Sequence, residues 1–127
     1  MENKMHMSEL HSEFISWIKS MLFYKDEFSF LQKRLEEIAV KNNSHEVMRY
    51  VEHFQNQFIL QKEVIDILKH DLNEEDTRLA EYAKANPVAS DHQLFGNHDE
   101  LKDRFETFEK LYLELKTDFE KFLAQNL

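Results

Sequence analysis

The sequence predicts an all-α protein, an antiparallel up-down-up bundle of three long helices. Apolar residues recur at heptad spacing along most of the chain, and only two stretches interrupt them. The 127 residues include one glycine and one proline, although sheet proteins need such residues for their many tight turns. We therefore expect helices over roughly 7–41, 44–85 and 97–126, packed as in a coiled coil, in a single domain, 1–127.

The first predicted helix carries an apolar row whose spacings alternate between four and three residues. The row is Leu10, Phe14, Trp17, Met21, Tyr24, Phe28, Leu31, Leu35 and Ile38. Only a helix places residues with this spacing on one face. The stretch KNNS then ends the row, and Ser44 has the side chain of a helix N-cap. The second helix should start there.

The second predicted helix has a row of the same kind. It comprises Val47, Val51, Phe54, Phe58, Gln61, Ile65, Leu68 and Leu72, and it continues to Leu79 and Tyr82. The phase carries across Asn73, which favours one continuous helix. Pro87 ends it, because the residue before a proline is disfavoured in the α region. Gln61 is a polar residue in the core row, and we expect it to form a hydrogen bond with Tyr24.

The third predicted helix begins within the stretch LFGNHDEL. Its row is Leu101, Phe105, Phe108, Tyr112, Leu115, Phe119 and Phe122, and His98 lies on the backward extension of that row. Gly96 is expected to end the preceding connection. Asn97 would then be the N-cap, with Glu100 three residues later as in a capping box.

Shorter apolar rows flank the core rows. Because the chain folds back at about residue 43, residues whose numbers add up to about 85 should lie at one level of the bundle. Ile18 and Leu22 are then expected to meet Val64 and Ile67. The layout of three long heptad helices, with Trp17 in the core of the first, resembles a spectrin-type repeat. This resemblance implies the three-helix fold and no residue role.

Composition excludes several classes of function. The net charge is −9 and basic residues are interleaved with acidic ones, which disfavours nucleic-acid binding. No apolar run approaches the roughly 20 residues of a membrane span, and no apolar segment near the N-terminus indicates secretion, so we expect a cytoplasmic protein without membrane contact. Without cysteine, thiolate metal sites and thiol nucleophiles are excluded. Glycine-rich phosphate loops are absent too.

Four large apolar residues fall outside all the core rows: Phe23, Phe30, Ile59 and Leu113. Single exposed apolar residues are common on any protein, whereas grouped ones mark contact surfaces. The function that the sequence favours is therefore a non-enzymatic bundle that associates with a partner protein or with itself.

The alternative function is binding of a divalent transition metal. In an antiparallel bundle one end collects His6, His11, His70, His92 and His98. By the level rule, His11, Asp71 and His98 could converge there, with His70 as a further candidate ligand. Imidazole and carboxylate groups suit zinc, iron, nickel or manganese. Histidines at bundle ends are, however, more often solvated or bonded to a neighbouring carboxylate.

Overall fold

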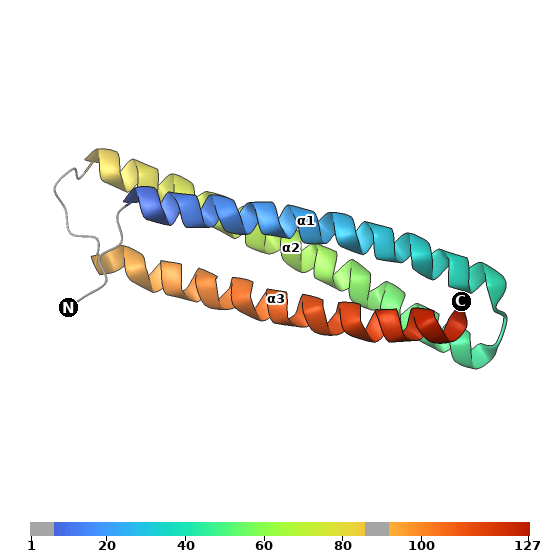
Figure 1. Ribbon diagram of the computed structural model, residues 1–127. Coiled ribbons are helices and arrows are strands. Elements are labelled where there is room, and N and C mark those ends of the chain that lie inside the picture. The colour runs from blue at the N-terminus through green and yellow to red at the C-terminus, as the bar shows by residue number, and fades with distance from the viewer. Residues whose placement is uncertain (1–6, 86–91) are drawn as a thin grey trace.

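The computed structural model describes the backbone of residues 7–85 and 92–127 and the side chains of 7–85 and 97–127. The chain forms three α-helices, α1 (Met7–Lys41), α2 (His45–Ala85) and α3 (His92–Asn126). They lie side by side, with α2 antiparallel to α1 and α3 (Figure 1). The predicted all-α, up-down-up bundle is confirmed. None of the described helices combines the length and the apolar character that crossing a membrane requires.

The connection between α1 and α2 follows the sequence prediction. Ser44 caps α2, since its hydroxyl oxygen accepts a hydrogen bond from the Val47 amide at 3.4 Å and its carbonyl accepts one from Met48 at 3.0 Å. Helix α2 passes through Asn73 without a break. It ends at Ala85, and the predicted stop at Pro87 lies outside the described residues.

The start of α3 differs from the prediction. The helix begins at His92, so Gly96 and Asn97 lie inside it rather than before it. A glycine within a helix costs only about 1 kcal/mol relative to alanine, which the packing of a long helix can offset. The predicted cap at Asn97 was therefore wrong. The Asn97 amide instead donates to Glu75 of α2 at 3.2 Å.

The core consists of the three heptad rows, as their spacing predicts. Fully buried phenylalanines occur along the whole bundle. Toward the end where α1 connects to α2, the rings of Phe58 and Phe119 meet edge to face at 5.1 Å. Nearer the other end, the Trp17 ring lies 5.5 Å from that of Phe105 and 5.6 Å from that of His98. Aromatic packing thus joins α3 to both other helices along their length.

Polar pairs lie along the grooves between helices. Between α1 and α2, Lys25 binds Asp66 at 2.7 Å. Between α1 and α3, Glu27 accepts hydrogen bonds from Lys116 at 3.0 Å and from Tyr112 at 3.1 Å. The hydrogen bond from Lys116 holds the pKa of the Glu27 carboxyl below its usual value. These pairs fix which flank of each helix faces which neighbour.

One flank of α2, with Asp66, faces α1, whereas the opposite flank, with Val64, faces α3. The prediction that Ile18 and Leu22 meet Val64 and Ile67 was wrong for this reason. Val64 lines a groove shared with α3, and the side chain of Ile67 is 59% exposed. Residue level alone does not reveal the flank, because the two flanks of a heptad row are symmetric in the pattern.

The predicted hydrogen bond between Gln61 and Tyr24 is also absent. The Tyr24 hydroxyl donates to Glu109 of α3 at 2.6 Å. Gln61 is buried in the core row as predicted, but its Oε1 has no hydrogen-bond partner among the described residues. Tyr24 lies on the side of α1 that faces α3, so its hydroxyl donates to a carboxylate of α3 rather than to Gln61 of α2.

Tyr24 should make the free energy of unfolding depend on pH in the alkaline range. Burial, together with the hydrogen bond to Glu109, raises the pKa of Tyr24 to about 12 from 10.0. Because the folded pKa is the higher one, the contribution is complete below pH 10 and is lost as the pH rises toward 12. We predict that the free-energy difference between wild type and Tyr24→Phe in urea unfolding is constant below pH 10 and then shrinks. A difference that stays constant up to pH 12 would contradict this.

Candidate functional site

The polar end of the bundle, away from the α1–α2 connection, holds the residues predicted to bind metal. His11 of α1 does not meet Asp71. Its Nδ1 donates instead to Asp76 of α2 at 2.8 Å. Asp71 lies on the flank of α2 that faces α3, where Arg104 donates to it at 2.8 Å. His11 and Asp71 therefore lie in different grooves, and the predicted convergence of the two does not occur.

His98 occupies the core position that the sequence assigned to it, and it is 6% exposed. Its Nε2 donates to the carboxylate of Glu13 on α1, and its Nδ1 lies 3.4 Å from the neighbouring Asp99. The ring packs against Trp17. His98 thus fills a core position between α1 and α3 and adds a hydrogen bond between the two helices. It is separate from the other two predicted ligands, since neither His11 nor Asp71 is bonded to it.

His70, Asp71 and Glu74 form a group on one turn of α2. One ligand atom from each can be chosen so that all three lie within 4.8 Å of one another, and this is the only such group of three among the described residues. His70 Nε2 is 3.4 Å from Glu74 Oε2, and both side chains are largely exposed. The group includes the predicted ligands His70 and Asp71 and adds Glu74. The side chains of His6 and His92 lie outside the described residues.

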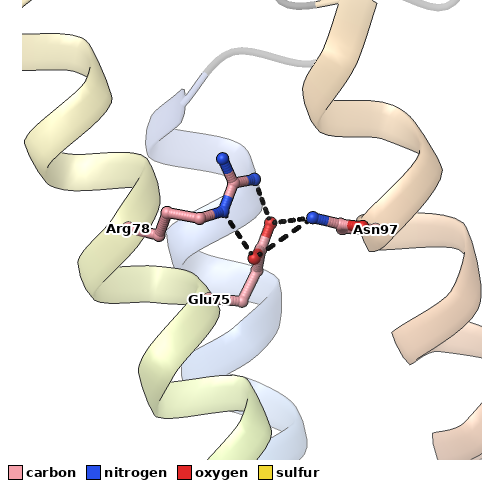
Figure 2. Close-up of polar contacts among 3 residues, drawn as sticks. All are labelled: Glu75, Arg78 and Asn97. Atoms are coloured by element: carbon pink, nitrogen blue, oxygen red, sulfur yellow. Dashed lines mark hydrogen bonds and ion pairs between the residues drawn. The ribbon is translucent and has the colours of Figure 1, made fainter.

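Beside this group, a cleft of about 720 Å³ runs between α2 and α3. At its base Glu75 occupies a core position of the heptad row, between Leu72 and Leu79, and is 9% exposed. Arg78 donates to both carboxylate oxygens, at 2.6 and 2.9 Å, and the Asn97 amide reaches both from α3 (Figure 2). A buried carboxylate needs such partners, because its desolvation is costly.

The Glu75 cluster is a structural ion pair. Each carboxylate oxygen accepts hydrogen bonds from both Arg78 and Asn97. The hydrogen bond with Glu75 raises the pKa of Arg78. Sequence reasoning missed Glu75, Asp76 and Glu13. The position of Glu75 in the core row was a signal that could have identified it, whereas Asp76 and Glu13 look like ordinary surface acids.

A second hollow, of about 250 Å³, lies further along the α2–α3 groove and is mostly apolar. Val64, Leu68, Phe108 and Leu111 line it, together with the unpartnered Gln61. Leu60 and Ile67 stand on the same outer flank of α2, seven residues apart, and are 50% and 59% exposed. Leu111, across the groove, is 44% exposed.

We name Leu60, Val64, Ile67 and Leu111 the apolar strip. Val64 and Leu111 line the hollow from the two sides of the α2–α3 groove. Leu60 and Ile67 lie four residues before and three after Val64, on the same flank of α2.

The apolar residues that the sequence placed outside the core are exposed, as predicted. On the α1–α3 side, however, they do not form a continuous surface. The ion pair between Glu27 and Lys116 joins α1 to α3, and it lies close along each helix to these residues: Phe23 and Phe30 are four and three residues from Glu27, and Leu113 is three from Lys116. An apolar partner covering that side would have to desolvate the ion pair, which carries a penalty. The hollow below the apolar strip is also lined by Asp103, Arg104 and Thr107. The ion pair of Arg104 with Asp71 lies seven residues from Leu111 and Val64, so it stands at the end of the strip rather than between these two residues.

Comparisons with known proteins give no relative for this chain. No protein-family model matches it, and no curated protein or solved structure does. The site must therefore be interpreted from its own geometry.

The Glu75 cluster yields a stability prediction. Replacing a buried ion pair by an apolar residue is often neutral or stabilising, whereas removing one partner strands the other. We expect Glu75→Leu to unfold at the same or a higher urea concentration than wild type. Arg78→Ala should cost about 1–2 kcal/mol, less than for a fully buried pair because Arg78 is half-exposed. The reverse order of stabilities would show that Glu75 does more than fill the core.

Proposed function

We propose that this protein is a non-enzymatic helical bundle that acts by binding a protein through the apolar strip. The partner is a second copy or a different chain, and the cytoplasm is the expected compartment. The observation that carries the proposal is the set of exposed apolar side chains on both sides of the α2–α3 groove, with a mostly apolar hollow between them. Scattered apolar residues are normal on a protein surface, but contiguous apolar patches mark contact sites.

The chemistry at the polar end supports a role other than catalysis. A catalytic acid, base or nucleophile needs a side chain that is free to act on a bound molecule. At this end the carboxylates of Asp76, Asp71 and Glu75 are each bonded to a cation or imidazole of the same chain. The pairs of Asp76 and Asp71 join α2 to α1 and to α3, and the pair of Glu75 with Arg78 lies within α2. The exposed side chains of the apolar strip make no such polar contact and are available to a partner.

Association is tested by photo-cross-linking of the full chain in native lysate. With benzoylphenylalanine in place of Ile67, we predict a discrete adduct on a gel, because this side chain would face the partner. The same group in place of Phe30, which is equally exposed on the other side of the bundle, is the matched control and should give none. Leu111→Lys should remove the adduct made at position 67.

If position 67 gave no adduct, or if Leu111→Lys left the adduct unchanged, the apolar strip would not be the contact surface. Circular dichroism of each variant checks that the helices are retained. Since positions 67, 30 and 111 are all exposed, the substitutions should not unfold the core.

Binding of a divalent transition metal is a second candidate function. It is favoured by the proximity of the ligand atoms of His70, Asp71 and Glu74. Imidazole and carboxylate oxygen are ligands of zinc and nickel. At this site the metal must compete with Arg104 for Asp71, which lowers the affinity. His11 and His98 are bonded to carboxylates of their own and do not join the group.

Titration calorimetry of the untagged protein with Zn²⁺ tests the metal site. We predict one equivalent bound per chain in wild type and a loss of binding in His70→Ala. His53→Ala, which removes another exposed histidine of α2, serves as the control and should bind as wild type does. Binding well below one equivalent, or equal binding by both variants, would exclude this site.

A further inference from the structure

We propose that the partner at the apolar strip is a second copy of this chain, paired about a twofold axis with α2 antiparallel to α2 and α3 antiparallel to α3. The inference rests on the proposed function and names the partner. It comes from the charged residues that flank the strip at both ends of the α2–α3 face.

The centre of the strip is well defined. Asp71 and Arg104 are bonded across the α2–α3 groove and so lie at one level. Val64 precedes Asp71 by seven residues, and Leu111 follows Arg104 by seven. In antiparallel helices Val64 and Leu111 must therefore share a level as well. Both line the same hollow, which agrees with this register. A twofold axis passing between them would bring Leu60 of one copy close to Ile67 of the other.

The charges on α3 are complementary under this rotation. Arg104 lies seven residues before Leu111 and Asp118 lies seven residues after it. Glu100 lies eleven residues before Leu111, and Lys121 lies ten residues after it. Glu100 and Arg104 border the cleft at one end of the face, while Asp118 and Lys121 border a hollow at the other end. The axis therefore places Arg104 opposite Asp118 and Glu100 opposite Lys121 of the other copy.

The charges on α2 follow the same rule. Glu74 lies ten residues after Val64, and His53 lies eleven before it. Glu81 lies seventeen after and Arg49 fifteen before. All four side chains are exposed. At 1.5 Å per residue, an offset of two residues is about 3 Å, within the reach of these side chains. Glu74 and Glu81 of one copy thus meet an imidazole and a guanidinium of the other.

The other face-to-face arrangement is disfavoured. A twofold axis parallel to the helices would put α2 of one copy against α3 of the other at equal level. Glu74 would then lie opposite Glu100, and like charges brought together at an interface cost free energy. Each copy also carries a net charge of −9, so two copies repel each other unless local pairs offset the repulsion. The parallel arrangement would also bring Asp71 opposite Arg104 of the other copy, but it keeps the contact of Glu74 with Glu100. The antiparallel pairing sets Glu74, Glu81 and Glu100 each opposite a basic group or an imidazole of the other copy.

The face is large enough for a dimer. The 35 residues of α3 span about 52 Å at 1.5 Å per residue, and two adjacent helices present a face about 20 Å wide. A specific interface buries about 800 Å² on each partner, which this face provides. The apolar strip would form its centre, and the charged pairs would lie at its rim.

Sedimentation equilibrium of the purified full chain tests the pairing. We expect a dimer that dissociates on dilution. Ile67→Lys should weaken it at least about 100-fold, because it places a lysine in each half of the apolar centre. Phe30→Lys adds the same charge on the other side of the bundle and should leave the dissociation constant unchanged. A wild-type chain that stays monomeric up to about 1 mM would overturn the proposal. A Kd above about 1 mM means a binding free energy weaker than about 4 kcal/mol, which is too small for a specific dimer.

A charge swap tests the antiparallel arrangement. Lys121→Glu and Glu100→Lys should each raise the dissociation constant about tenfold, because the twofold axis counts each change twice. The double variant restores opposite charges and should return to within about threefold of wild type. A double variant as weak as the single ones would overturn this pairing. A third outcome would separate the two proposals. If the purified chain is monomeric and the photo-cross-link at position 67 captures a different protein, self-association is overturned while the proposed binding function stands.

Discussion

The structure depends on one core of mainly apolar residues that extends along three long helices. Each helix contributes a single row of residues with alternating spacings of four and three, and burial of these rows is the main stabilising term. Because a row is only one residue wide, the residues on its two flanks lie at the edges of the grooves between helices. The ion pairs, the cleft and the apolar strip all occupy such flank positions.

Among the described residues, three polar side chains interrupt the core rows, and their hydrogen bonding differs. Glu75 is held by Arg78 and Asn97, and His98 is bonded to Glu13. Gln61 alone has an unpartnered oxygen, at the floor of the α2–α3 groove. An unpaired buried acceptor costs about 1–3 kcal/mol. The two satisfied residues belong to the polar end, whereas the unsatisfied one lies next to the surface that we propose binds a second copy.

Exposed apolar residues on the two sides of the bundle differ in their surroundings rather than in their exposure. Phe30 and Ile67 are almost equally exposed. Phe30 lies three residues from Glu27, which forms an ion pair with Lys116, while Ile67 lies three residues from Val64, which lines a hollow with Leu68, Phe108 and Leu111. The cost of desolvation therefore differs between the two sides. At the polar end Asp71, Asp76 and Glu75 each form an ion pair within the chain.

The sequence by itself determined the number of helices, their antiparallel order, the core rows and even the burial of His98, because the heptad period defines one face of a helix without reference to its neighbours. It misplaced the start of α3, since the signals at Gly96 and Asn97 are local and packing overrode them. Only the tertiary structure decided that His11 meets Asp76 and that Asp71 meets Arg104. A heptad row has two equivalent flanks, and the handedness with which the third helix packs selects which flank faces which neighbour.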